Sequence, residues 1–358
     1  MVLDMKKLVM CVWNDFDKDD RVRKKAYSLS KKFKVVVKSV CKAPKPQHVR
    51  IISPTLLVEY YWVTKARKHS PRWFFYRLIA NKEFWIDKVE PADVYDCNDP
   101  DTLVAGVIAK KRYGSKLVYD SHEYWARTMR KEATLYYTLY SYIGNFLQYI
   151  RELAYYKYAD RIITVSKSIQ EIYKNKYNKP TYLIYNYSNY NKDKVLPFSQ
   201  RKNIVVFLGG KVRVGVSKHF KLFNELGFKV FVIGVNGSSK GVFYTGFLTK
   251  EEYRVIMREC ILGFYAPENT CKNIYYSMPN KIFEYIQSGL PIVVNNMKDM
   301  SGFVSDNKLG YVFDKSISKY HLLSTINQDY IYDNLKKAKK KFSWESQEPN
   351  LFKIYKFN

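Results

Sequence analysis

Short runs of apolar and β-branched residues alternate along this chain with stretches whose apolar residues recur at helical spacing. Runs of this kind are typical of strands that are buried on both faces. The predicted strands are 8–13, 34–40, 93–96, 116–121, 161–166 and 181–185, then 203–210, 229–234, 242–246, 260–265 and 290–295. Helices are expected after Asp20, Pro100, Arg127 and Ser168, and over about 217–226, 249–259 and 281–288.

The strand–helix order occurs twice, and it predicts two parallel sheets that carry helices on both faces. Between the two series lies the segment 186–203, which is polar and weakly patterned and makes a natural linker. A length of 358 residues also favours two domains. The sequence therefore predicts an α/β protein of two Rossmann-like, doubly wound domains, with a domain boundary near residue 190.

Composition excludes some classes of protein and favours certain partners. The chain is 47% hydrophobic, which excludes global disorder. It has 61 Lys and Arg against 33 Asp and Glu, a net charge of +28, which attracts polyanions such as nucleic acid, anionic lipid or nucleotide phosphates. The five cysteines are scattered without paired spacing, which favours a reducing, cytoplasmic location over a disulfide framework.

No secretory leader is expected at the N-terminus, because acids lie on both sides of its short apolar run. The charge-free run 133–150 is the best candidate for a membrane span. It contains several polar residues and tyrosines, so we expect a buried or interfacial helix there instead.

Two basic stretches stand out. Residues 21–50 contain eleven Lys or Arg and no acid, and residues 65–82 surround four clustered aromatic residues with six more cations. Cations around an aromatic wedge suit an anionic membrane surface, and this interpretation places the protein at the periphery of a membrane. The alternative is a solvated basic face with the aromatic residues in the core. Nucleic acid is the weaker partner, because no nucleic-acid-binding module is present.

The most informative local pattern is YYSMPNKIFEYIQSGLPIVVNN at 275–296. Asn280 ends a loop, and Lys281 then opens a helix at the end where the macrodipole is already positive. A cation fits there if an anion binds, because backbone N–H groups and Lys281 could hold a phosphate together. Glu284 lies one turn further, where its carboxylate could accept hydrogen bonds from two ribose hydroxyls. The alternative is that Glu284 only complements the helix dipole.

These residues resemble the C-terminal signature of the retaining GT-B glycosyltransferases of family 4. Further matches follow in family order: Asp20-Arg21-Val22, the strand KLVYDSHEYW at 116–125, ADRIITVSKSI at 159–169 and IYN at 184–186. The resemblance implies a GT-B fold with two domains facing a central cleft. It also implies an acceptor domain over 1–190, a donor domain over 191–340 and a helix over 341–358, containing Trp344, that folds back toward the first domain.

The resemblance also implies roles for individual residues. Glu284 would bind the ribose of a nucleotide-diphosphate sugar, UDP- or GDP-linked, and Lys281 would lie near its diphosphate. Arg213 and Lys218 would stabilise the departing nucleotide, with Lys211 as an alternative to Arg213. Gly209 and Gly210 would let the backbone approach the donor closely. Asn280 and Tyr276 complete the expected donor-binding set.

His122 follows Asp120 at the end of a predicted buried strand, where doubly wound folds place their ligands. The resemblance implies that it faces the donor sugar, either to position it or to handle a proton. Asp120 and Glu123 are expected to orient His122 or to anchor the loop. Many relatives carry Glu where this chain has Tyr276. The usual sugar contact of that Glu is then open, and Asn273 is a substitute for it.

Asp99-Pro100-Asp101 has the form of a metal-binding DxD motif. It lies at a predicted helix start, with Asp99 as N-cap and Pro100 in the first turn, so we expect no metal site and metal-independent transfer. The predicted function is retaining glycosyl transfer from a nucleotide sugar to an acceptor hydroxyl of a glycan, a lipid-linked molecule or a protein. The alternatives are a sugar-nucleotide epimerase of the same architecture and a nucleic-acid-binding protein on a degenerate transferase scaffold.

Overall fold

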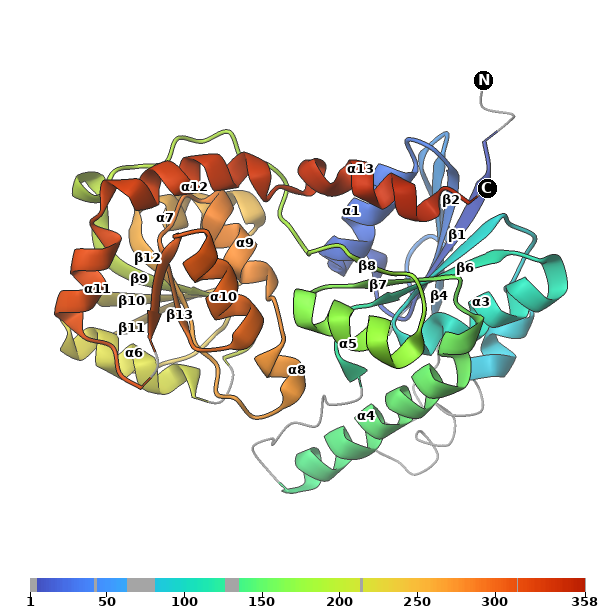
Figure 1. The fold of residues 1–358 in the computed structure, drawn as a ribbon, viewed down its shortest axis with the longest axis horizontal. Helices are drawn as coiled ribbons and strands as arrows, with labels where there is room; N and C mark the ends of the chain where they lie inside the picture. The colour runs from blue at the N-terminus through green and yellow to red at the C-terminus, as the bar shows by residue number, and fades with distance from the viewer. Residues whose placement is uncertain are drawn as a thin grey trace. The chain divides into compact units, whose positions relative to one another are not determined.

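The computed structural model describes residues 5–41, 44–62, 81–125, 135–212, 215–313 and 315–357, with side chains of helix α4 from residue 142 onward. It divides into two compact units. The first comprises residues 1–185, 271–273 and 348–358, and the second comprises residues 186–270 and 274–347. The helices and strands of both units are labelled in Figure 1.

The first unit is built on an eight-stranded sheet in the order β3-β4-β2-β1-β5-β6-β7-β8. Every pairing is parallel except that of β3 with β4. Its strands are β1 (Lys7–Val12), β2 (Lys34–Cys41), β3 (Val49–Ser53), β4 (Leu56–Trp62), β5 (Val94–Asn98), β6 (Lys116–Ser121), β7 (Arg161–Thr164) and β8 (Thr181–Leu183). Its helices are α1 (Asp20–Leu29), α3 (Pro100–Tyr113), α4 (Leu135–Tyr155) and α5 (Lys167–Tyr177).

The second unit has a six-stranded, wholly parallel sheet in the order β11-β10-β9-β12-β13-β14. Its strands are β9 (Lys202–Leu208), β10 (Lys229–Ile233), β11 (Val242–Gly246), β12 (Cys260–Tyr265), β13 (Ile292–Asn295) and β14 (Gly310–Phe313). The helices are α6 (Val216–Glu225), α7 (Lys250–Glu259), α8 (Lys272–Tyr275), α9 (Asn280–Gln287), α10 (Lys298–Asp306), α11 (Lys319–Ile326), α12 (Asp329–Lys341) and α13 (Trp344–Tyr355), of which α8 and α13 also contribute residues to the first unit.

The predicted fold class is confirmed: both units are doubly wound parallel sheets, and every predicted strand is present. The central strands β1, β5, β6 and β12 are almost wholly buried, which is why they read as continuous apolar runs. The pattern did not predict β3, β4 or β14. Strand β4 alternates between buried and partly exposed positions, and β3 and β14 are mostly exposed or partly exposed, so none of them is buried on both faces.

The C-terminal segment 348–358 belongs to the first unit. There Glu348 of α13 accepts hydrogen bonds from Ser28 and Lys31 of α1, and Figure 1 shows α13 beside α1. In the part of the chain that the structure describes, no helix is both long and apolar enough to span a bilayer. The expected helix over 133–150 is α4, whose charged residues are discussed below.

Candidate active site

The first group of candidate residues lies at the carboxyl edge of the first sheet. Strands β5 and β6 are parallel and pair Asn98 with Asp120, so the residues that follow each strand emerge side by side. Asp99 follows β5, and His122 follows β6. The backbone N–H of His122 donates to Oδ1 of Asp99 at 2.9 Å, and its Nδ1 lies 3.3 Å from Oδ2 of the same carboxylate.

Asp99 has a strained backbone, with φ 64° and ψ 164°, a region that residues other than glycine rarely adopt. Asp99 is the N-cap residue of helix α3 and Pro100 begins the helix, as predicted, but the Asp99 side chain makes no capping hydrogen bond. It turns toward His122 instead, and Oδ1 also accepts from Nε1 of Trp125 at 3.2 Å. Strain held at this strand end points to a positioning role for Asp99.

Below His122 lies a set of buried charges. Asp120 has a fully buried carboxylate, 3.6 Å from Nε2 of His122. Arg21 donates to both of its oxygens, at 2.8 and 3.2 Å, and Lys25 donates to Oδ2 at 2.5 Å. Lys25 is itself wholly buried and also contacts Asp96 at 2.8 Å. Burial favours the neutral form of Asp120, but Arg21, Lys25 and His122 outweigh it, so its pKa lies well below the usual range.

The charges of this cluster balance only when His122 is protonated. Arg21 and Lys25 match Asp96 and Asp120, which leaves Asp99 to be matched by the imidazole. Burial disfavours the imidazolium, yet Asp99 and Asp120 outweigh it and raise the pKa of His122. Burial also raises the pKa of Asp99 to about 6, and His122 opposes that rise in part. Near neutral pH the pair can therefore hold and exchange one proton.

Two further side chains secure this edge of the unit. Tyr355 of α13 donates its buried hydroxyl to Oδ1 of Asp96 at 2.9 Å, which ties the C-terminal helix to the charged cluster. Glu123, expected either to orient His122 or to anchor the loop, accepts from the side-chain amide of Asn273 at 2.9 Å. Asn273 belongs to the first unit and also accepts from the backbone N–H of Tyr124. Glu123 and Asn273 therefore anchor the loop after β6.

Two residues predicted to bind the nucleotide-sugar donor, Gly209 and Lys281, lie close together in the second unit. The chain leaves β9 through Gly209, and Lys281 opens helix α9. Nζ of Lys281 lies 4.7 Å from the ring centroid of Phe207 and 4.0 Å from that of Tyr265. It lies so close to Gly209 that a Cβ there would be 2.8 Å from Nζ. A glycine is thus required for the lysine to occupy this position.

Glu284, the expected ribose ligand, has its carboxylate surrounded by donors of the second unit. Nζ of Lys250 lies 2.7 Å from Oε1, which also accepts from the hydroxyl of Ser188. Nε and Nη2 of Arg254 approach Oε2 at 3.3 and 3.2 Å. These contacts address about four lone-pair positions, all that a carboxylate offers. A ribose at Glu284 therefore needs Lys250, Arg254 or Ser188 to give way.

The remaining predicted donor residues are less tightly placed. Lys218 pairs with Glu268 at 2.9 Å on the surface of α6, and Arg213 lies outside the described residues. Nothing lies within 4 Å of a Cβ built on Gly210. Asn280 is exposed at the start of α9. Nζ of Lys298 lies 5.7 Å from the ring centroid of Tyr276, within the range of a cation–π contact.

The sequence did not single out Asp99, Lys250 or Arg254 as site residues. A signal existed for the last two: Lys250 and Arg254 stand four apart on one face of the predicted helix over 249–259. Their partner is more than thirty positions away, so no local pattern linked them to Glu284.

The basic stretch 21–50 is not a free cationic face, as the membrane interpretation assumed. Arg21, Lys24, Lys25 and Lys38 are buried and ion-paired, Lys24 with Asp20 and Lys38 with Glu59 and Glu90. The stretch 65–82 lies outside the described residues except for its last two positions.

Among the described residues, no group of three or more His, Cys, Asp or Glu side chains could hold a metal ion. The two carboxylates of the Asp99-Pro100-Asp101 motif diverge. Asp99 turns to His122, whereas Asp101 accepts from Gln148 and from Nη1 of Arg151, the latter at 2.6 Å.

The chain resembles known proteins both in part of its sequence and in its fold. Residues 31–187 match the family model described as Glycosyltransferase Family 4. This match covers the N-terminal part of the chain, which is therefore similar to Glycosyltransferase Family 4. The family resemblance predicted from the sequence is thus confirmed. A search of curated proteins finds no match.

Solved structures show the same fold along nearly the whole chain. Sucrose-phosphate synthase from Thermosynechococcus elongatus aligns with a TM-score of 0.74 at 13% identity, covering 98% of each chain. WaaG, a glycosyltransferase involved in lipopolysaccharide biosynthesis, gives 0.59 at 14% identity over 98% of this chain and 100% of WaaG. The catalytic domain of starch synthase IV from Arabidopsis thaliana, bound to ADP and acarbose, gives 0.61 at 11% identity over 98% of each chain. At these identities the likeness shows the GT-B fold.

Proposed function

We propose that this glycosyltransferase moves a sugar from a nucleotide-diphosphate sugar to an acceptor hydroxyl of a glycan, a lipid-linked molecule or a protein, with retention at the anomeric carbon. The observation that carries the proposal is the meeting of Lys281 with Gly209 at the start of α9. Solved structures of the same fold hold nucleotides, as the ADP-bound starch synthase shows for that protein.

The start of α9 has the chemistry of a diphosphate site. Its N-cap is Pro279, which makes no side-chain capping hydrogen bond. Ile282 N–H donates to the carbonyl of Pro279, so the N–H groups of Asn280 and Lys281 remain at the positive end of the helix dipole. The Lys281 ammonium lies beside them. A diphosphate bound there would gain backbone N–H donors and a cation, and both would stabilise the negative charge that develops as the nucleotide departs.

The residues proposed to bind the nucleotide-sugar donor are consistent with transfer that needs no metal ion. Both acidic side chains of Asp99-Pro100-Asp101 are engaged by protein groups, and the cation beside the expected diphosphate is Lys281. On the first unit, His122 would position the sugar or handle a proton, since it is the protonatable group of a strained and charged strand end.

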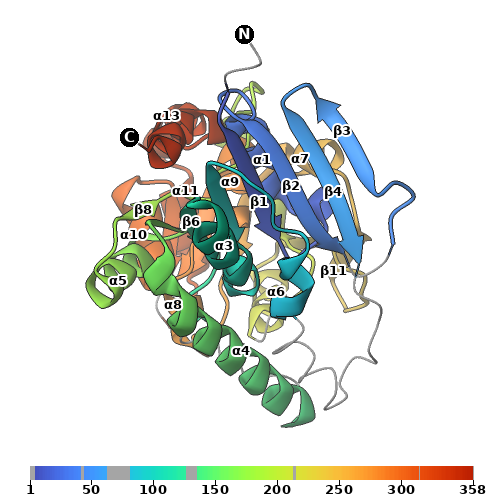
Figure 2. The same cartoon turned by 90° about the vertical axis from the view of Figure 1, so that its right-hand side faces the viewer.

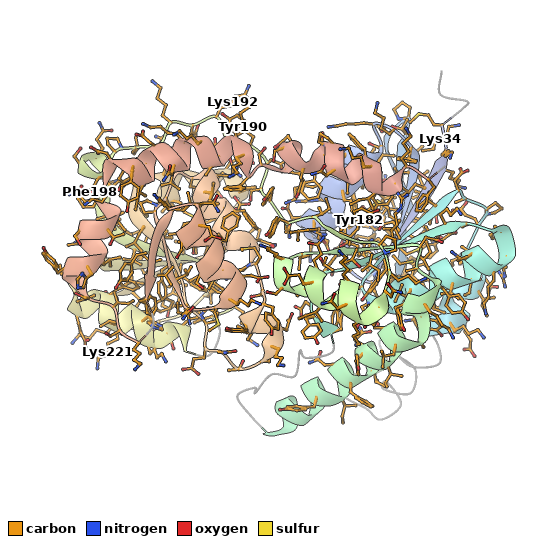
Figure 3. All side chains as sticks on the ribbon, viewed as in Figure 1. Lys34, Tyr182, Tyr190, Lys192, Phe198 and Lys221 are labelled. Atoms are coloured by element: carbon orange, nitrogen blue, oxygen red, sulfur yellow. The ribbon has the colours of Figure 1, made fainter. Side chains whose placement is uncertain are left out.

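The first test is thermal stabilisation by UDP, GDP, ADP and their sugars. A ligand at a hundred times its dissociation constant stabilises by about 2.7 kcal/mol. We expect one nucleotide series to raise the melting temperature of the wild type, and the Lys281→Met variant to lose that rise. Lys221→Met is the matched control, because Lys221 is an exposed lysine of α6 that points outward (Figure 3). A wild type that no nucleotide stabilises would overturn the proposal.

The second test follows the reaction. With the stabilising donor and a set of acceptor glycans and lipid-linked sugars, NMR of the product should show the anomeric configuration of the donor retained. An inverted product refutes retention. Epimerised donor formed without any acceptor supports the epimerase instead. Nucleic-acid affinity with a steep salt dependence and no nucleotide binding supports the third candidate, although burial of Arg21, Lys24, Lys25 and Lys38 removes cations that it would use.

A further inference from the structure

Helix α4 of the first unit has its polar side chains inside and its apolar side chains outside. Gln148, Arg151 and Glu152 are buried, at 4%, 6% and 0% exposure. The outward residues Tyr142, Ile143, Phe146 and Ile150 are 36–52% exposed. A surface helix of a soluble protein normally shows the opposite arrangement.

The inward side chains fix the rotation of the helix about its axis. Gln148 and Arg151 donate to Asp101 of α3, and α4 packs along α3. Glu152 accepts from the hydroxyls of three tyrosines, Tyr119, Tyr173 and Tyr177. Rolling α4 to bury its apolar side would break all of these buried hydrogen bonds. The apolar stripe is therefore held outward by the structure beneath it.

The outward residues form one continuous stripe. With 3.6 residues per turn, positions 142, 143, 146 and 150 fall within an arc of about 100° on the helix. Within residues 142–155 the only acid is Glu152, which is buried, so the outward side of this part of α4 carries no negative charge. Figure 2 shows α4 at the periphery of its unit, next to α3 and α5.

Lysines border the C-terminal end of the stripe. Nζ of Lys176 lies 4.6 Å from the ring centroid of Tyr149, and the exposed Lys157 follows α4 directly. Nζ of Lys111 lies 5.2 Å from the ring of Tyr158. The nearby acid Asp160 is paired with Lys110 at 2.6 Å. The border of the stripe is thus basic.

We infer that the stripe of Tyr142, Ile143, Phe146 and Ile150 docks the first unit onto an anionic lipid surface. The apolar side chains enter the headgroup and acyl boundary, tyrosines lie at the interface, and the bordering lysines meet lipid phosphates. A second copy of this chain fits the surface less well, because it would bring two strongly basic molecules together. The inference goes beyond the proposed transfer reaction, since docking requires no donor.

The test is flotation with vesicles of phosphatidylcholine alone and of phosphatidylcholine mixed with phosphatidylglycerol. We expect the wild type to bind the anionic vesicles and to be released by high salt. The variant Ile143→Asn/Phe146→Ser/Ile150→Asn should partition at least about tenfold less. The matched control is Val255→Asn/Tyr320→Ser/Tyr330→Ser, which removes three apolar side chains of the second unit that are 46–78% exposed and should bind as the wild type does.

Three results would overturn the inference: no binding of the wild type to anionic vesicles, equal binding of the α4 variant, or a wild-type dimer that the α4 variant dissociates while vesicle binding stays unchanged. Circular dichroism and the melting temperature report whether each variant is folded. Lys281→Met, which tests the proposed donor site, should bind vesicles normally, so failure of one proposal is distinguishable from failure of the other.

Discussion

The imidazole of His122 lies between the carboxylates of Asp99 and Asp120, with Nδ1 3.3 Å from the first and Nε2 3.6 Å from the second. The three residues follow or end two neighbouring parallel strands, β5 and β6. Arg21 and Lys25 hold Asp120 ionised from below. The protonation state of the imidazole is therefore set by the strand ends that position it.

Replacing Asp99 by Asn should lower the pKa of His122 toward its ordinary value. Asp99 is the largest of the contributions that raise this pKa against the effect of burial. In the wild type, a raised pKa means that His122 contributes stability below about pH 6.5, lost as the pH rises through the folded-state pKa. NMR titration of the imidazole measures the shift. His219 of the second unit, whose pKa burial lowers, is the internal control and should not move. An unchanged His122 titration contradicts the assignment.

Replacing Lys25 by Met should destabilise the fold by about 3–5 kcal/mol, because Asp96 and Asp120 would be left buried without one of their cations. The control is Lys31→Met, which removes a surface pair with Glu348 and should cost about 1 kcal/mol or less. Urea unfolding measures both. The double variant Lys25→Met/Asp96→Asn should recover part of the loss, since it removes an unpaired charge. Equal effects of the two lysine substitutions would show that the buried cluster is not held by charge.

Gly209→Ala should weaken nucleotide binding while leaving the second unit folded. The new Cβ would lie 2.8 Å from Nζ of Lys281, and the flexible lysine can move away at little cost in stability. Its ammonium would then leave the start of α9. Gly302→Ala in α10 is the matched control, because nothing lies within 4 Å of a Cβ at Gly302 and this residue is not part of the expected donor site. Calorimetric titration with the nucleotide that stabilises the wild type compares them. Equal nucleotide affinities of the two variants would show that Lys281 is not part of the donor site.

Glu152→Gln should change how stability depends on pH. Burial raises the pKa of Glu152, while hydrogen bonds from Tyr173, Tyr119 and Tyr177 oppose that rise in part. A carboxyl group whose pKa is raised in the folded state lowers the stability of the fold as the pH rises above its pKa in the unfolded state, about 4.5. The free energy of unfolding of the wild type should therefore fall relative to that of Glu152→Gln between pH 5 and pH 8. The control for replacing a glutamate of this unit is Glu171→Gln, which changes an exposed side chain of α5.

Much of the fold could be predicted from the sequence, because strands buried on both faces must be apolar along their whole length. The run KLVYDS at 116–121 is β6, and CILGFY at 260–265 is β12. The sheet-edge position of His122 followed from the same pattern, since it comes directly after such a strand. The motif around Lys281 also placed this residue correctly at the start of a helix.

Other features depended on contacts between distant residues. Lys25 meets Asp96 and Asp120, 71 and 95 positions away, so a stretch that reads as a basic face is in part a buried ion-pair cluster. Asp99 reads as a helix cap, but the loop after β6 offers it stronger partners in His122 and Trp125.

The sequence by itself determined the two parallel sheets, the family and the strand ends at which candidate residues lie, because apolar periodicity and local motifs are carried by neighbouring residues. Only the tertiary structure decided which charges are buried, which side of α4 faces outward and which cations hold Glu284. Each of these depends on partners that the chain brings together from far apart, and ion pairs and hydrogen bonds of that kind leave no periodic trace in a sequence.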